Sequence, residues 1–145
     1  MYAKWIAIPL LSLVLMACAQ ATPAPELVDR PAFDALDGTS WTLTHCGDKE
    51  LLARTVISIN FENYQLSGNT GCNSYEADYD VRGQDLKVRT VMQTAMACVE
   101  PDGLMEQEAE YLKVLQGVTA FEMQEGQLIL LNQENIRLVF VPADN

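Results

Sequence analysis

Basic residues are scarce in this sequence of 145 residues, where nine lysines and arginines stand against 20 aspartates and glutamates. The resulting formal charge of −11 argues against a DNA- or RNA-binding protein, because phosphate binding requires a basic face. Histidine occurs once, as His45, which removes most histidine-based catalytic sets. Hydrophobic residues make up 49% of the chain, as in a globular protein, and the length supports one domain or at most one domain plus a tail.

The apolar run at residues 5–17 is too short to cross a bilayer, which needs about 20 residues. Behind the single charge of Lys4, it fits the hydrophobic region of a secretory signal. It ends in Leu15-Met16-Ala17-Cys18, which resembles the lipobox of bacterial lipoproteins, where the cut precedes a cysteine that carries a diacylglycerol. We therefore expect residues 1–17 to be a lipoprotein signal peptide and Cys18 to be lipidated, since two or more acyl chains anchor a protein stably. The alternative is an ordinary signal peptide in which Cys18 is incidental.

The residues after Cys18 predict where the protein sits and how it is tethered. Ala19 follows the cysteine in place of aspartate, and in enteric-type lipoproteins this implies the outer membrane, here with the domain facing the periplasm. Residues 18–35 are rich in proline and alanine and lack apolar periodicity, so they read as a tether with a reach of about 50 Å. The folded domain is expected at residues 36–141.

Alternating apolar and polar residues predict three β-hairpins. Their turns are expected at Glu62-Asn63, Gly83-Gln84 and Glu125-Gly126. Pairing across each turn puts apolar side chains opposite one another on one face. The expected pairs are Ile59–Leu66, Phe61–Tyr64, Tyr79–Val88, Val81–Leu86, Phe121–Leu130 and Met123–Leu128.

The second hairpin also carries an acidic trio, Glu76, Asp78 and Asp80, on its other face. Three carboxylates on one strand face are compatible with a calcium site or a glycosidase pair. The same register, however, places Lys87 opposite Asp80 and Arg89 opposite Asp78, and such pairs stabilise by about 0.2–1 kcal/mol each. We therefore interpret the trio as a solvated face and predict neither a metal site nor catalytic residues there.

Residues 128–131 are apolar at every position, which predicts a strand buried on both faces. A helix at about 103–116 is the expected cover for the second face, with Asp102 as its N-cap. Its predicted apolar stripe is Leu104, Met105, Tyr111, Leu112 and Leu115, with Glu106, Glu108 and Glu110 mostly on or beside the solvent side. A last strand follows at residues 136–141. The predicted fold class is α+β, an antiparallel β-sheet built as a hairpin meander and covered by one main α-helix.

Three cysteines remain if Cys18 is lipidated, and the compartment outside the inner membrane is oxidising. Cys46, Cys72 and Cys98 allow three single pairings, among which spacing does not choose, and one thiol is left over. With His45 they also make a possible Cys3His zinc set. No CxxC spacing exists, however, and adjacent His45 and Cys46 point to opposite faces of a strand. We therefore predict no metal site and no cofactor.

The segment at residues 67–73 (SGNTGCN) is rich in glycine but lacks the lysine and the following helix of a phosphate-binding P-loop. Gly68, Gly71 and Asn73 are residue types that tolerate positive φ, so we predict a tight strand-to-strand turn. A Ser/His/Asp set is not credible, because the single histidine accompanies no recognisable nucleophile motif. No catalytic residue is therefore predicted.

Three motifs taken together resemble the META domain, also called the HslJ-like family. They are Leu36-Asp-Gly-Thr-Ser-Trp41-Thr-Leu, Leu66-Ser-Gly-Asn-Thr-Gly-Cys-Asn-Ser-Tyr75 and Thr94-Ala-Met-Ala-Cys98, followed by Glu108, Leu112 and Leu115. The resemblance covers roughly residues 36–141 and implies that the antiparallel sheet is curved. It favours a disulfide between Cys72 and Cys98, which occupy the family's two cysteine positions, whereas Cys46 has no counterpart there.

The resemblance also implies a role in the cell envelope. Members of the family occur on secreted and envelope proteins, often as lipoproteins, are associated with heat shock and envelope stress, and have no established catalytic residues. Some are similar in structure to pilotin lipoproteins, which bind a segment of an outer-membrane secretin. We therefore predict a non-enzymatic lipoprotein that binds an envelope protein or supports the outer membrane under stress. The alternative is a periplasm-facing binder of a small apolar or amphipathic ligand, in a pocket lined by Tyr64, Tyr79 and Phe121.

Overall fold

The computed structural model describes residues 33–144 of the chain. The expected signal peptide, Cys18 and nearly all of the expected tether lie outside the described residues. The helices are α1 (Phe33–Leu36) and α2 (Leu104–Gln116). The strands are β1 (Thr39–Cys46), β2 (Lys49–Glu50), β3 (Ser58–Glu62), β4 (Gln65–Asn69), β5 (Ser74–Arg82), β6 (Asp85–Val88), β7 (Met92–Gln93), β8 (Val118–Gln124), β9 (Gln127–Asn132) and β10 (Arg137–Pro142).

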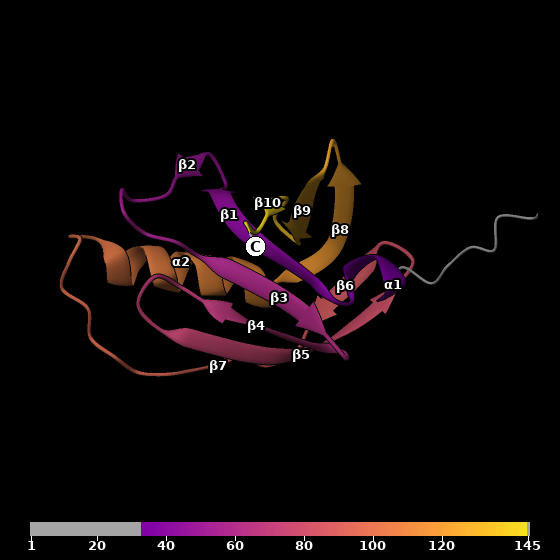
Figure 1. Cartoon of the computed structure of the whole chain (residues 1–145), viewed down its shortest axis with the longest axis horizontal. Coiled ribbons are helices and arrows are strands. Elements are labelled where there is room, and N and C mark those ends of the chain that lie inside the picture. The colour runs from indigo at the N-terminus through magenta and orange to yellow at the C-terminus, as the bar shows by residue number, and fades with distance from the viewer. Residues whose placement is uncertain (1–32, 145) are drawn as a thin grey trace, which may run out of the picture.

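Eight of the strands in this described part form an antiparallel barrel, in the order β10-β9-β8-β6-β5-β4-β3-β1. The pairing of β1 with β10 closes the ring and places Trp41 opposite Pro142 and Leu43 opposite Phe140. In Figure 1 the indigo strand β1 accordingly lies beside the yellow strand β10. The two-residue strands β2 and β7 are additions that pair with β1 and β5.

The predicted fold class, a curved sheet covered by one main helix, is therefore wrong. The sheet closes on itself, and α2 contributes Tyr111, Val114 and Leu115 to the same core that the barrel strands fill. Hairpin patterns specify pairings between strands that are adjacent in sequence, whereas closure depends on a pairing between the two ends of the domain. The alternation of residues along β1 does not indicate that a long strand pairs with each of its two edges.

The core is built from side chains that alternate along the strands. Along β5, Tyr75, Ala77 and Tyr79 are buried, and the residues between them are exposed. The rings of Phe61 and Tyr79 meet edge to face, with their centroids 5.2 Å apart. Each large apolar side chain buried in this way stabilises the fold by about 1.5–3 kcal/mol, so the alternation fixes the register of the barrel.

Two of the three predicted hairpin registers are confirmed. In the second hairpin, the structure pairs Tyr79 with Val88 and Val81 with Leu86, as predicted. The pairs of the third hairpin are Phe121–Leu130 and Met123–Leu128.

The first hairpin turns one residue later than predicted. Its central residues are Asn63 and Tyr64, with φ of 52° and 65°, so Phe61 faces Leu66. A type I′ turn needs positive φ at both central positions, and Asn63 meets this need in either turn, so the observed shift exchanges Glu62 for Tyr64 as the other central residue. Phe61 stays inside the barrel as a result, while the side chain of Tyr64 is 57% exposed.

The acidic trio of β5 lies on the exposed outer face of the barrel. Asp80 Oδ2 lies 2.8 Å from Arg89 Nη2, although the backbone register puts Arg89 beside Asp78, whose carbonyl oxygen accepts from Arg89 N at 2.9 Å. A long arginine side chain reaches a diagonal neighbour on a sheet as readily as the one directly opposite. Asp78 instead accepts a long hydrogen bond from Gln65 Nε2, at 3.4 Å.

The helix departs from its predicted details at both its start and its buried face. Gly103, with φ of 87°, is the N-cap in place of Asp102, and no side chain caps the first turn. Met105 is 38% exposed, although it was placed in the apolar stripe, and Glu108 is only 3% exposed, although it was placed beside solvent. Leu104, Tyr111 and Leu115 are buried as predicted, together with Val114.

Strand β9 is buried at Leu128, Ile129 and Leu130, as its apolar run predicts, whereas Leu131 is half-buried. Leu128 and Leu130 share the core cluster with the residues of α2, whereas Ile129, on the other face of the strand, does not belong to that cluster. The helix therefore packs on the interior side of β9, and the expectation that it covers the second face is wrong. Within residues 33–144, none of the helices is long and apolar enough to span a membrane.

Candidate functional site

The predicted turn residues occupy three different places around the end of β4. Gly71 lies in the turn, with φ of 96°, and its N–H donates to Asn69 Oδ1 at 2.7 Å. Gly68 lies within β4, where an added Cβ would sit 1.9 Å from the carbonyl oxygen of Ser58, so a close approach of strands requires glycine there. Asn73 follows the turn and is almost fully buried, at 1% exposure.

A buried carboxylate joins this turn to α2. Glu108 accepts hydrogen bonds from the Thr70 hydroxyl, from Asn73 N at 3.2 Å and from Asn73 Nδ2 at 2.9 and 3.1 Å. A buried carboxylate requires such donors, because an unpaired charge in the interior is very costly. A signal for its burial was present in the sequence, since Leu104, Glu108 and Tyr111 follow the spacing of one helix face.

The side chain of Asn73 also holds the segment that precedes α2, residues 94–103, which we call the motif loop. Asn73 Oδ1 accepts from Met96 N at 2.8 Å and from the Thr94 hydroxyl at 2.7 Å. Asn73 Nδ2 donates to the carbonyl oxygen of Met96 at 3.2 Å. The amide thus bonds both backbone groups of Met96, as a neighbouring strand would, and fixes the loop against the barrel.

The disulfide between Cys72 and Cys98, with Cα atoms 6.0 Å apart, fixes the same loop a second time. This is the pairing that the family resemblance favoured, and it is confirmed. Cys46 is a free, buried cysteine, and burial raises the pKa of its thiol, with a further increase from Glu110. His45 is exposed on the opposite face of β1. The histidine and the three cysteines therefore do not come together, and the described residues contain no cluster that could hold a metal ion.

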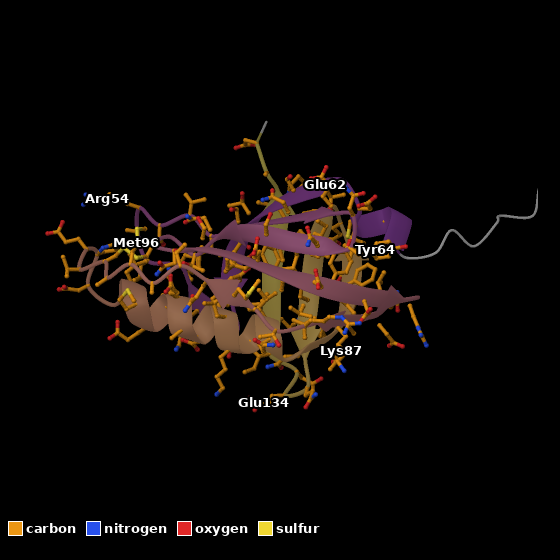
Figure 2. The ribbon with its side chains drawn as sticks, turned by 90° about the horizontal axis from the view of Figure 1, so that it is seen from below. Arg54, Glu62, Tyr64, Lys87, Met96 and Glu134 are labelled. Carbon is orange, nitrogen blue, oxygen red and sulfur yellow. A yellow bond between two sulfur atoms is a disulfide. The ribbon has the colours of Figure 1, made fainter. Side chains whose placement is uncertain are left out.

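Four exposed apolar residues are carried by the motif loop and its two flanks. Val99 is 81% exposed, Met92 is 60%, Met96 is 56% and Met105 is 38% exposed. We call these four residues the motif-loop surface. Figure 2 shows Met96 at one end of the domain and Tyr64 near the other end. Beside Met92, a hollow of about 350 Å³ lies between β5 and β7 and is lined by Ser74–Glu76 and Met92–Thr94.

A second concave region follows the weakest joint of the barrel. Strands β6 and β8 share one residue pair, Asp85 with Ala120, and beyond it Gln116 bridges the gap by donating to the carbonyl oxygen of Arg89 at 2.9 Å. The groove there has a volume of about 660 Å³ and is lined by Tyr64, Leu86, Lys87, Val118 and neighbours.

The predicted ligand-binding residues are not brought together in this groove. Tyr64 lies on its edge, but Tyr79 and Phe121 are buried in the barrel core at 1% and 4% exposure. The interior of the barrel is therefore filled by side chains of its own. Burial raises the pKa of Tyr79 to about 12, with a smaller contribution from Asp37.

A pair of buried tyrosines lies where β5 meets α2. The hydroxyls of Tyr75 and Tyr111 are 2.5 Å apart, and Tyr75 Oη also donates to the carbonyl oxygen of Ser58 at 2.9 Å. Burial raises the pKa of both phenols above the ordinary value. Both hydroxyls are used in packing the helix onto the barrel and neither is exposed, so we assign this pair a structural role.

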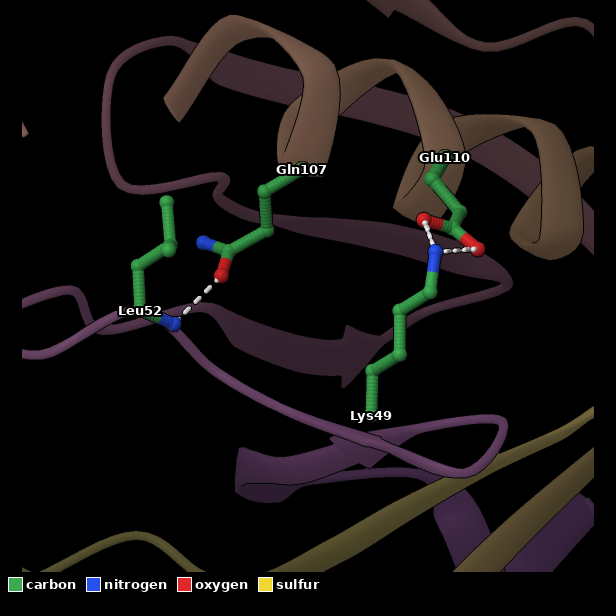
Figure 3. Close-up of polar contacts among 4 residues, drawn as sticks. All are labelled: Lys49, Leu52, Gln107 and Glu110. Atoms are coloured by element: carbon green, nitrogen blue, oxygen red, sulfur yellow. Dashed lines mark hydrogen bonds and ion pairs between the residues drawn. The ribbon is translucent and has the colours of Figure 1, made fainter. Parts of the chain in front are cut away.

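The other side of α2 is attached to β2 and to the loop that follows it, as Figure 3 shows. Lys49 Nζ lies 2.8 Å from Glu110 Oε2, and this contact raises the pKa of Lys49. Leu52 N donates to Gln107 Oε1 at 2.7 Å. These contacts, together with Glu108 and the disulfide, hold the helix and the motif loop in one fixed arrangement.

Solved structures with a similar fold are known. An NMR structure of a protein from Burkholderia xenovorans aligns with a TM-score of 0.64 at 24% identity and covers 86% of this chain and 99% of its own. The crystal structure of a DUF4847 family protein from Bacteroides vulgatus aligns with a TM-score of 0.58 at 10% identity, over 77% of this chain and 97% of its own. At these identities the likeness concerns the fold alone. No curated protein matches the chain.

The family assignment rests on a sequence match. The family model of the META domain matches residues 34–145, which include the barrel, the turn with Asn73, the motif loop and the buried Glu108. This range covers most of the chain, and this protein is therefore a member of the META domain family.

Proposed function

We propose that this protein is a non-enzymatic lipoprotein of the cell envelope whose META domain binds a protein partner. The observation that carries the proposal is the motif-loop surface. Met96 and Val99 stand exposed on a loop whose backbone is held by Asn73 and by the Cys72–Cys98 disulfide. Exposed apolar side chains on a fixed backbone are typical of an interaction site, because little conformational freedom remains to be lost on binding.

The proposed anchor is an acylated Cys18 in the outer membrane, with the domain facing the periplasm. The support is the lipobox-like sequence at residues 15–18 and the alanine that follows it. The intact mass of the protein extracted from membranes tests this part. It should show the loss of residues 1–17 together with acylation of Cys18, and an unmodified chain that keeps those residues would contradict it.

The interaction is tested by photo-crosslinking in cells, with and without heat shock. A photoreactive amino acid replaces Val99 in one strain and Glu134, elsewhere on the domain, in a control strain. The same envelope protein should be captured repeatedly from position 99 and not from position 134. A blank result at position 99 in both conditions would contradict the proposal.

A second candidate function is binding of a small apolar or amphipathic ligand. The observation that favours it is the groove between β6 and β8, whose volume of about 660 Å³ is within the range of ligand sites. Native mass spectrometry of the purified protein should then show a bound molecule. Its absence would count against this function and leave the protein-binding proposal intact.

A further inference from the structure

The motif-loop surface lies in a segment that is acidic as well as apolar. No lysine or arginine occurs between Thr90 and Leu112, while five acidic residues do. Glu108 is buried, and Glu110 is paired with Lys49. The remaining three, Glu100, Asp102 and Glu106, are exposed among the apolar residues.

One cation lies at the same end of the domain. Arg54 is exposed and lies at the same end of the domain as Met96 in Figure 2. The three exposed carboxylates of residues 100–106 therefore outnumber the guanidinium of Arg54. Surface charges of one sign around an apolar centre select a partner of the opposite sign, and they increase the rate at which it associates.

The apolar residues are suited to a partner that presents aliphatic side chains. Three of the four are methionines, and methionine side chains adapt to differently shaped apolar partners because they are unbranched and polarisable. The hollow beside Met92 offers a place for one such side chain. The backbone beneath Met96 is already bonded to Asn73, so its side chain is left to make contacts with a partner.

The charge of the surface argues against a lipid bilayer as its occupant. Figure 2 places Met96 at the end of the domain away from α1, where the described chain begins. The described chain therefore begins at the opposite end of the domain from Met96. Anionic headgroups would be repelled by Glu100, Asp102 and Glu106.

We propose that the motif-loop surface binds a basic amphipathic segment of the protein partner. The apolar face of that segment packs on Met92, Met96, Val99 and Met105, and its lysine or arginine side chains face the three exposed carboxylates. This inference rests on the proposed protein-binding function, and it names the chemistry of the partner.

The test uses the full mature chain, residues 18–145, made without its lipid by Cys18→Ser. The probe is a fluorescein-labelled amphipathic peptide of leucine and lysine, and its matched control has glutamate at every lysine position. Fluorescence anisotropy gives the Kd of each peptide at about 50 and about 300 mM NaCl. The lysine peptide should bind at least about tenfold more tightly than the glutamate peptide, and its affinity should fall at the higher salt concentration.

Variants separate this surface from the general acidity of the domain. Val99→Asp should weaken binding of the lysine peptide about tenfold. Met123→Asp, which changes an exposed apolar residue outside the motif-loop surface, should leave the binding unchanged. Glu100→Lys should weaken binding, whereas Glu134→Lys makes the same change of charge elsewhere and should have less than about a third of that effect. Circular dichroism of each variant verifies that the barrel is folded.

Equal effects of the two lysine variants, or of the two aspartate variants, would overturn the inference, because the peptide would then bind through overall charge or nonspecific apolar contact. Equal affinity for the two peptides would overturn it as well. Capture of a partner from position 99 in cells, combined with such a negative result, would show that the protein-binding function holds and that the partner segment is not basic. Lysine-peptide binding that depends on Val99 and Glu100 supports the inference.

Discussion

Replacement of the buried carboxylate should destabilise the domain more than any change on the exposed side of α2. Glu108→Ala removes the acceptor for three donor groups, the hydroxyl of Thr70 and the backbone and side-chain amides of Asn73. Hydrogen bonds to a charged group contribute about 1.5–3 kcal/mol each, so the gross loss is about 4.5–9 kcal/mol.

The net loss is smaller for two reasons visible in the structure. Each donor keeps a second acceptor, because Asn73 N also bonds Thr70 Oγ1 at 3.0 Å, Asn73 Nδ2 bonds the carbonyl of Met96, and the Thr70 hydroxyl bonds the carbonyl of Asn73 at 2.9 Å. Removal of the carboxylate also removes the cost of burying its charge. We therefore expect the free energy of unfolding to fall by about 2–4 kcal/mol.

Urea unfolding followed by the fluorescence of the buried Trp41 measures this loss. Glu108→Gln keeps the volume and one acceptor oxygen, so it should lose about half as much. Glu106→Ala, on the exposed side of the same helix, is the control and should change the stability by less than about 0.5 kcal/mol. If Glu108→Ala were as stable as Glu106→Ala, the assignment of the carboxylate as the joint between turn and helix would be refuted.

Three further predictions concern the core and the loop. Gly68→Ala should cost more than about 3 kcal/mol in urea unfolding, because the new Cβ would lie 1.9 Å from a backbone oxygen of β3, and a loss below about 1 kcal/mol would contradict this. Tyr111→Phe should cost about 1 kcal/mol at pH 7, since it removes the bond to Tyr75. Because burial raises the pKa of both phenols, their stabilisation is complete below about pH 10 and is lost as the pH rises above it, so unfolding titrations should show a steeper alkaline decline for the wild type than for Tyr111→Phe. Replacing Cys72 and Cys98 together by alanine should cost about 3–4 kcal/mol, and a reductant should then destabilise the wild type but not the double variant.

The sequence predicted the local parts of this fold well. Alternation along β5, β6, β8 and β9 gave two hairpin registers, because one face of each strand must be buried and a slip of one residue would reverse the faces. The first turn was misplaced because both candidate positions keep Phe61 inside, so burial does not distinguish them. Asn63 is central in both turns, so its tolerance of positive φ does not distinguish them either.

Long-range features of the site were harder to predict. The closure of the barrel depends on the pairing of β1 with β10, and no local pattern encodes it. Glu108 was assigned to solvent because a carboxylate is usually exposed, although its place among the apolar positions of α2 indicated otherwise. The role of Asn73 in holding Met96 depends on two segments that are brought together only by the fold. The disulfide pairing followed from the family resemblance and not from spacing.

The pairing of the first and last long strands affects when the barrel can close during synthesis of the chain. The strand that completes it, β10 (Arg137–Pro142), is the last of the barrel strands to be made, so β1 lacks this partner until all the other strands have been synthesised. Contacts that span almost the whole domain also slow folding. A truncation before Arg137 would expose the unpaired edges of β1 and β9 together and would favour aggregation over a smaller folded product.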